Sequence, residues 1–365
     1  MKTMQVVYRV AGAASEIEAR ARAIAVEQSI EMPPGAVRNE RVMREILGRV
    51  EDISDDGAGH FLVTIGLALE TTGGEAGQLL NMLFGNSSLH PDLELVDLVL
   101  PGEGGPYFGG GPRFGVEGLR RLCGAVGRPM TATALKPQGS TTAELARLAG
   151  IFARAGIDVI KDDHGLADQG SAPFAERVGA IQAEVDRANR ETGGRTLYAP
   201  SLTGGPRRLL AQLSAARNAG VRAMLIAPMI SGLGALQELA GESLPILAHP
   251  ALAGSARLAP PLLLGKLFRL AGADAVIFPN HGGRFSFAPD QCLALAEAAR
   301  RPWMGLAAAL PVPAGGIHLE RIEELLAFYG RDVMLLIGGA LLEAPDLESA
   351  AQDFVERVAA AGSRT

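Results

Sequence analysis

A run of polar residues follows directly after a short, mainly apolar segment, residues 157–160. The run is Lys161, Asp162, Asp163 and His164. The apolar segment is typical of a strand buried on both faces, and charged side chains at the end of such a strand usually line a cleft. Asp163 can offer a carboxylate oxygen and His164 an imidazole nitrogen to a divalent cation. Lys161 can join them only as a carbamate formed with CO2, because a protonated amine has no free electron pair. We therefore predict a metal site at Lys161, Asp163 and His164; the alternative is a structural ion pair.

Lys136 and His249 each follow another apolar run and are candidates for proton transfer and substrate binding. A lysine held out of water has a lowered pKa and can carry a proton to and from carbon, which is the role that we predict for Lys136. The alternative is a lysine that extends into solvent. We predict that His249 hydrogen-bonds to a substrate hydroxyl, with a structural role as the alternative.

Glycine pairs follow two apolar runs near the end of the chain, and plain turns are one interpretation of them. Barrel enzymes commonly bind phosphate through backbone N–H groups after their last two strands. We therefore predict a phosphate site at Gly315, Gly316, Gly338 and Gly339. Residues 280–284 are predicted to form a mobile lid, since two glycines permit hinge motion. There Arg284 can pair with phosphate, and Asn280 and His281 are further candidates for substrate binding.

From residue 129 onward, short apolar runs alternate with helical stretches, which is the pattern of a (β/α)8 barrel. The expected strands are residues 130–135, 157–161, 196–200, 223–227, 246–248, 275–278, 310–313 and 333–337. Helices are expected at residues 142–155, 175–189, 207–218 and 319–328. In such a barrel the loops after the strands meet at one face, so the candidate residues above should converge there.

The first third of the chain is predicted to be a smaller α+β domain of ferredoxin-like type. Strands are expected at residues 5–10, 61–69 and 93–100, and helices from residue 15 to about residue 26 and at residues 75–83. Ser15 and Glu18 have the spacing of a capping box for the first helix. We expect two domains, residues 1–125 and 126–365.

Composition excludes several classes of function. The chain has 365 residues, 48% of them hydrophobic, with a formal net charge of −6. It carries no basic tract, so nucleic-acid binding is not expected. Cys123 and Cys292 have no metal-ligand spacing and indicate free thiols in a reducing compartment. The N-terminus has no signal-peptide core and no long apolar run is present, so we expect a soluble cytoplasmic protein without a membrane segment.

Several of these motifs resemble those of the ribulose bisphosphate carboxylase (RuBisCO) superfamily. Lys161-Asp162-Asp163-His164 is similar to the family's Lys-Asp-Asp-Glu metal motif. Residues 108–115, 127–129 and 135–137 resemble the approach to its first barrel strand, and residues 310–318 and 336–340 resemble its phosphate motifs. The resemblance runs from about residue 26 to about residue 345. It implies Mg²⁺ bound to a carbamylated Lys161, with Lys136 handling protons at the substrate carbons. It also implies a homodimer whose active site is shared, with Asn86 and Glu27 supplied by the partner.

The departures from the family pattern indicate a RuBisCO-like protein that does not fix CO2. His164 stands where the family has a glutamate, so the metal site carries less negative charge. Pro250 replaces an arginine that binds phosphate, which argues against a bisphosphate substrate. The lid has Gly283-Arg284-Phe285 where carboxylases have Gly-Lys-Leu. This chain therefore lacks the lysine that stabilises the carboxylate formed when a carboxylase adds CO2. Further differences are Gln138 for a lysine, Ala253 for a histidine and Ala314 for a serine.

The resemblance implies an enzyme that enolises a sugar phosphate. The first hypothesis is the isomerisation of 5-methylthioribulose 1-phosphate, and the apolar residues Pro250, Leu252 and Phe285 would suit its methylthio group. A second hypothesis is a decarboxylase or C–C hydrolase of a 3-oxo sugar-acid phosphate, of the 3-oxo-isoapionate 4-phosphate type. A third is the diketo phosphate enolase of methionine salvage. A catalytically inactive scaffold is the alternative from another class, although a scaffold has no need of a buried lysine.

Overall fold

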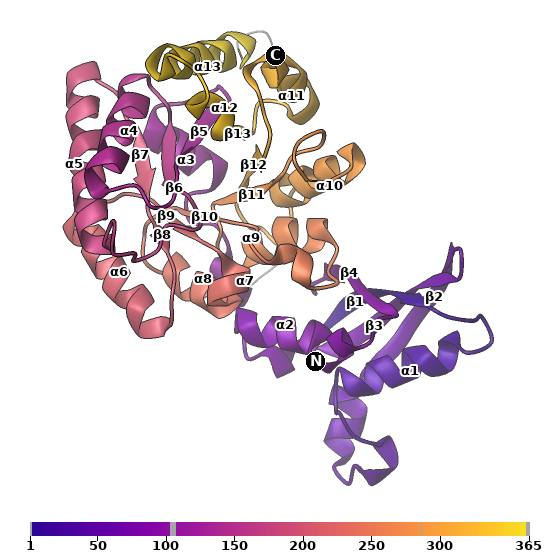
Figure 1. Ribbon diagram of the computed structural model, residues 1–365. Helices are drawn as coiled ribbons and strands as arrows, with labels where there is room; N and C mark the ends of the chain where they lie inside the picture. The colour runs from indigo at the N-terminus through magenta and orange to yellow at the C-terminus, as the bar shows by residue number, and fades with distance from the viewer. Residues whose placement is uncertain (1, 103–106, 286, 363–365) are drawn as a thin grey trace.

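The computed structural model describes residues 2–102, 107–285 and 287–362 of the chain. Figure 1 shows a small sheet with helices on one side of the molecule and a larger α/β barrel on the other. This confirms the predicted fold class.

The N-terminal part is a four-stranded antiparallel sheet in the order β2-β3-β1-β4. Its elements follow the ferredoxin-like sequence of strand, helix, strand, strand, helix, strand: β1 (Thr3–Ala11), α1 (Ile17–Glu27), β2 (Arg49–Gly57), β3 (His60–Ala68), α2 (Ala76–Phe84) and β4 (Leu93–Val99). Along β1 every second side chain is buried, namely Met4, Val6, Tyr8 and Val10. This alternation is the reason that the segment forms a strand with one face on a core.

Two details of this part differ from the prediction. Strand β2 was not predicted, because it lies at the edge of the sheet and its polar side chains are mostly exposed, so it lacks the alternating apolar pattern. The capping box of Ser15 and Glu18 is not formed. Helix α1 has Glu16 as its N-cap and no side-chain cap, so Glu18 lies one position too early to close the box.

The barrel has parallel strands at all eight predicted positions of the described chain. They are β5 (Met130–Leu135), β6 (Val159–Asp162), β7 with β8 (Leu197–Ala199 and Ser201–Leu202), β9 (Met224–Ile226), β10 (Ile246–Ala248), β11 (Ala275–Pro279), β12 (Leu310–Ala314) and β13 (Met334–Leu336). Pro200 divides the third strand, so that β7 pairs with β6 and β8 pairs with β9. Strands β12 and β13 lie side by side and complete the ring.

Helices surround these strands on the outside (Figure 1). They are α4 (Thr142–Arg154), α5 (Phe174–Thr192), α6 (Pro206–Asn218), α7 (Pro228–Ser231), α8 (Leu233–Ala240), the π-helical η7 (Pro261–Leu267) with α9 (Phe268–Leu270), α10 (Pro289–Arg300), α11 (Ile322–Tyr329), α12 (Gly339–Leu342) and α13 (Leu347–Gly362). Inside the barrel, side chains from the strands form one buried cluster, and α3 (Gly115–Cys123) adds Val116 and Leu119 to it. Helix α3 therefore closes the end of the barrel at which the strands begin.

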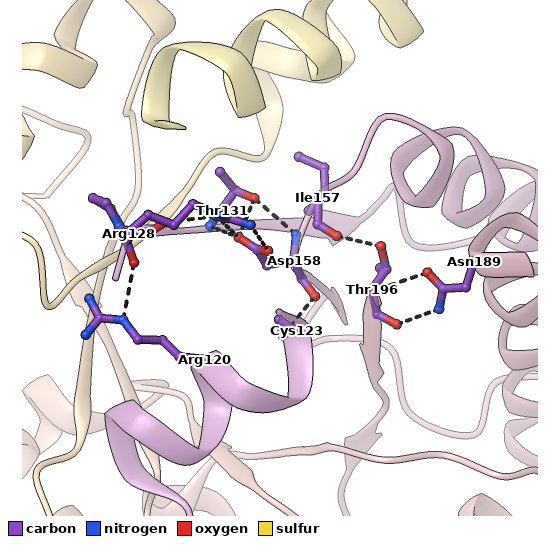
Figure 2. Close-up of polar contacts among 9 residues, drawn as sticks. Arg120, Cys123, Arg128, Thr131, Ile157, Asp158, Asn189 and Thr196 are labelled. Atoms are coloured by element: carbon purple, nitrogen blue, oxygen red, sulfur yellow. Dashed lines mark hydrogen bonds and ion pairs between the residues drawn. The ribbon is translucent and has the colours of Figure 1, made fainter. Parts of the chain in front are cut away.

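Asp158 ties the beginnings of β5 and β6 together at this closed end (Figure 2). Its carboxylate accepts hydrogen bonds from both Nη atoms of Arg128, at 2.8 and 2.7 Å, and from the N–H of Thr131 at 2.9 Å. A buried carboxylate with this many donors holds one fixed position.

The two parts of the chain are joined along β4. The N–H of Leu95 donates to the carbonyl of Arg257, and the N–H of Ala259 donates to the carbonyl of Leu95. Lys266 forms an ion pair with Asp97 across the same boundary. Among the described residues, no helix combines the length and the apolar character that crossing a bilayer requires.

Candidate active site

Lys161 lies in β6 with only 3% of its surface exposed. Its Nζ donates to the backbone carbonyl of Asp162 at 3.0 Å. Burial lowers the pKa of Lys161 to about 8; the charge of Asp163 opposes this shift and the charge of Lys136 adds to it. A neutral amine is therefore accessible at mildly alkaline pH.

Asp163 is the centre of the polar cluster at the ends of β5 and β6. Its Oδ1 accepts a hydrogen bond from Nζ of Lys136 at 2.8 Å and lies 3.4 Å from Nδ1 of His164. Its N–H donates to the carbonyl of Leu135, which fixes one strand end against the other. Burial acts to raise the pKa of Asp163, but the contacts with His164 and Lys136 and the charge of Lys161 outweigh it, so that its pKa is lowered. Asp163 is thus a carboxylate that holds the Lys136 ammonium in place.

His164 and His249 come from β6 and β10 and meet across the barrel mouth. Their rings stack with centroids 4.3 Å apart and an interplanar angle of 14°. Burial, with the charges of Lys161 and His164, lowers the pKa of His249 to about 2. The N–H of Ala251 donates to Nδ1 of His249 at 3.1 Å, so the ring proton is on Nε2. His249 is therefore a neutral hydrogen-bond donor near neutral pH.

The glycine pair after β13 lies beside this cluster, and the other pair follows the neighbouring strand β12. Gly315 and Gly316 have φ values of +88° and +97°, which a residue with a side chain rarely adopts. A Cβ on Gly338 would lie 3.9 Å from Cε of Lys136. Gly338 is the N-cap of α12, and no side chain caps the first N–H groups of this short helix.

The predicted lid packs directly on the first glycine pair. The N–H of Arg284 donates to the carbonyl of Gly315 at 3.0 Å, and a Cβ on Gly283 would collide with that same oxygen. The Arg284 guanidinium lies 5.5 Å from the centroid of the Phe285 ring, and 52% of the Phe285 surface is exposed. This loop thus presents a cation and an aromatic ring next to Gly315 and Gly316.

Asn280 and His281 instead face helix α11. Asn280 is fully buried, its Oδ1 accepts from the Tyr329 hydroxyl at 2.7 Å, and its Nδ2 donates to the carbonyl of His281 at 2.9 Å. The His281 ring packs against Phe328 with centroids 4.7 Å apart. The chain thus occupies the side chain of Asn280, whereas Nε2 of His281 is buried without a hydrogen-bond partner among the described residues. Substrate binding by Asn280 and His281 stays a prediction.

Asn86 and Glu27 lie together on the N-terminal part of the chain. Nδ2 of Asn86 donates to Oε1 of Glu27 at 2.9 Å and to Oε1 of Glu31 at 2.6 Å. Asn86 is exposed at the start of the 3-10 helix η4 (Asn86–Leu89). The structure therefore brings these two predicted residues together, and places them on a part of the chain separate from the barrel cluster.

The chain is similar to known proteins over almost all of its length. Residues 115–280 match the family described as ribulose bisphosphate carboxylase large chain, catalytic domain. A 5-methylthioribulose-1-phosphate isomerase of Rhodospirillum rubrum is 52% identical, over 99% of this chain and 97% of that protein. The crystal structure of a RuBisCO-like protein from Rhodopseudomonas palustris matches with a TM-score of 0.91 at 50% identity, over 98% of each chain. The chain belongs to the RuBisCO-like proteins.

The chain is also similar to more distant enzymes. A 2,3-diketo-5-methylthiopentyl-1-phosphate enolase of Geobacillus thermodenitrificans is 36% identical, over 73% of this chain and 67% of that protein. This chain is therefore more similar to the isomerase than to this enolase.

The RuBisCO resemblance implies Mg²⁺, and the donors of this RuBisCO-like chain can be tested against it. Among the described residues, no group of three or more His, Cys, Asp or Glu side chains is arranged to hold a metal ion. Asp163 and His164 supply two donors, and one carboxylate with one imidazole is a poor set for a hard cation. A carbamate on Lys161 would add the missing anionic oxygen beside Asp163. The residues therefore fit Mg²⁺ when Lys161 is carbamylated.

Sequence reasoning missed a second buried network behind the RuBisCO-like site. Asp162 is fully buried, and its Oδ2 lies 3.1 Å from Nη2 of Arg177, which is also fully buried. The Tyr198 hydroxyl donates to Asp162 Oδ1 at 2.8 Å, and the N–H of Ser201 donates to Oδ2 at 3.0 Å. Side chains alternate along a strand, so Asp162 points away from Lys161 toward α5. Two features of the sequence could have indicated this network: the alternation of side chains along β6, and an arginine among the apolar positions of α5.

Proposed function

We propose that this chain is an isomerase of 5-methylthioribulose 1-phosphate that moves protons between substrate carbons through an enediolate. The observation that carries the proposal is the Lys136–Asp163 contact of 2.8 Å beside the buried Lys161, in a chain 52% identical to a protein of that name. A positioned amine beside a carboxylate is what carbon-to-carbon proton transfer requires.

Lys136 acts as the proton carrier in this mechanism. In its neutral form, its amine takes the proton from the carbon beside the substrate carbonyl, which leaves an enediolate. The resulting ammonium returns the proton to the former carbonyl carbon, so that the carbonyl moves by one carbon. A second shift of the same kind moves the carbonyl to the next carbon and gives a 1-methylthio-pentulose 5-phosphate. Asp163 keeps Nζ of Lys136 in one orientation between the two steps. His249 donates from Nε2 to a substrate oxygen and remains neutral throughout.

Mg²⁺, held by Asp163, His164 and a carbamate on Lys161, would polarise the substrate carbonyl when bound. The buried amine of Lys161, with its pKa lowered to about 8, supports the carbamate, because CO2 reacts with the neutral amine.

The rim of the barrel supplies groups for both ends of this substrate. Gly315, Gly316, Gly338 and Gly339 would bind the phosphate through backbone N–H groups, with Arg284 as its counter-charge. Leu252 and Phe285 are 58% and 52% exposed, and they would cover an apolar methylthio group. A homodimer would add Asn86 and Glu27 of the second copy to the site.

The test is incubation of the purified chain with 5-methylthioribulose 1-phosphate, Mg²⁺ and bicarbonate in D2O. The expected result is a 1-methylthio-pentulose 5-phosphate that carries deuterium at carbon, with no CO2 released. Absence of deuterium from both substrate and product would contradict the proposal.

Parallel incubations with the substrates of the other two hypotheses separate the alternatives. Release of CO2 from a 3-oxo sugar-acid phosphate, without conversion of the methylthio sugar, would favour the decarboxylase. Turnover of the methylthio diketone phosphate alone would favour the enolase, the name of relatives that are 36% identical to this chain.

A further inference from the structure

A cavity of about 440 Å³ opens at the closed end of the barrel. Three segments line it: the end of α3, the last turns of α5 with the turn into β7, and the connection from α6 into β9. Each segment precedes a strand, whereas Lys136, Lys161 and His249 lie at or after strand ends. The cavity is therefore at the opposite end of the barrel from the candidate active site.

Positive charge dominates this cavity. Arg121, Arg190, Arg195 and Arg222 line it together with a single acidic residue, Asp186. Oδ1 of Asp186 already accepts a hydrogen bond from Gln182 at 2.8 Å. Among the described residues, the side chains of the four arginines make no ion pair and no hydrogen bond, and all four are exposed.

Neighbouring arginines on the same helices do have partners. Arg120, beside Arg121 on α3, is buried and lies 2.8 Å from Asp332. Arg187, on α5, pairs with Glu184 at 2.5 Å and with Glu191 at 2.6 Å. The chain as a whole carries a net charge of −6. The four arginines around this cavity, which have no carboxylate partner in the described part of the chain, therefore form a positively charged region on a protein of negative net charge. Their mutual repulsion is relieved when an anion binds.

The walls of the cavity are fixed by hydrogen bonds. Asn189 donates to the carbonyl of Thr196 at 3.0 Å and accepts from its N–H at 2.9 Å, as Figure 2 shows. These two bonds close the turn that carries Arg190 and Arg195. A Cβ on Gly124 would come within 3.3 Å of Cδ of Arg195, so the glycine leaves room for that side chain. Fixed walls with cationic side chains are typical of an anion-binding site.

We propose that this cavity binds a small polyanion of the diphosphate class. Guanidinium groups pair with phosphate oxygens in a bidentate manner, and four of them from three segments can contact two linked phosphates at once. The volume is within the range of small-molecule sites. A single phosphate would leave part of the positive charge without a partner.

The experiment is a calorimetric titration of the full chain with inorganic pyrophosphate, and separately with inorganic phosphate, at low ionic strength. Pyrophosphate should bind more tightly than phosphate. The Arg195→Gln/Arg222→Gln double variant should weaken pyrophosphate binding by about tenfold or more, because two charge-assisted contacts are lost. Arg38→Gln is the matched control, since Arg38 is also exposed and lies outside the cavity.

Two further measurements separate binding in this cavity from binding at the active site and from a loss of stability. Arg284→Gln, which removes the proposed counter-charge of the phosphate at the candidate active site, should bind pyrophosphate in the cavity as the parent does. The double variant should unfold in urea no more easily than the parent when no anion is present, since it has lost repulsion and no contact. Equal binding by parent and double variant would overturn the proposal, as would equal losses in the double variant and Arg38→Gln, or loss of binding in Arg284→Gln.

Discussion

The imidazole rings of His164 and His249 lie face to face, with centroids 4.3 Å apart. The two residues are far apart in sequence: His164 follows strand β6 and His249 follows strand β10. His249 is neutral because burial lowers its pKa to about 2, so the stack does not set two full charges against each other. Packing against the neutral ring of His249 therefore holds the His164 ring.

His164→Glu should increase the affinity for Mg²⁺. The variant adds an anionic oxygen beside Asp163, and the affinity of oxygen sites for hard cations rises with ligand charge, so we expect a dissociation constant roughly tenfold lower. Calorimetric titration with Mg²⁺ in the presence of bicarbonate measures it. His60→Glu makes the same change of charge at β3, away from the barrel, and should leave Mg²⁺ binding unchanged. Equal binding by His164→Glu and the parent would show that residue 164 is not a ligand.

Lys136→Ala should abolish most of the deuterium incorporation into the methylthio sugar phosphate. Loss of a positioned general base lowers the rate by about 10²–10⁴-fold. NMR of the substrate in D2O measures the exchange, and Lys2→Ala is the control because it removes a lysine at the start of β1. Exchange at the parental rate in Lys136→Ala would assign the proton transfer to another group.

Arg177→Met should destabilise the fold strongly. The substitution leaves the fully buried carboxylate of Asp162 without its cation, and removal of one partner of a buried pair costs about 3–5 kcal/mol. Urea unfolding followed by circular dichroism measures the loss. Arg187→Met, on the same helix but exposed, should unfold nearly as the parent does. If the two variants have equal stability, the Asp162–Arg177 contact does not support β6.

Lys161 should make the free energy of unfolding rise with pH in mildly alkaline solution. Its pKa is lowered to about 8 by burial, whereas a lysine in an unfolded chain has a pKa of about 10.4. Between these values the unfolded chain binds more protons than the folded chain, so stability increases with pH, by up to about 1.4 kcal/mol per pH unit. Urea unfolding without Mg²⁺, in CO2-free buffer, should show a smaller rise for Lys161→Met. Lys2→Met should keep the parental slope. Identical slopes for all three chains would mean that Lys161 has an ordinary pKa.

The sequence predicted the barrel well because each of its units is local. An apolar run of three to six residues followed by an amphipathic helix indicates a strand and its covering helix, and all eight strand positions of the barrel are confirmed in the described chain. The edge strand β2 has no such run, since most of its side chains face water, and its pairing with β3 is what defines it.

For the candidate site too, some features follow from the local sequence and others only from the tertiary structure. The sequence by itself determined which side chains end the strands, and the geometry of a parallel barrel then brings Lys136, Asp163 and His249 to one face. Tertiary structure alone decided their partners: the contact of Lys136 with Asp163, the stack of His164 on His249 and the burial of Asp162 against Arg177. The arginine cavity belongs to this second group. Strand-end positions follow from local periodicity, whereas contacts and burial depend on how segments distant in sequence pack together.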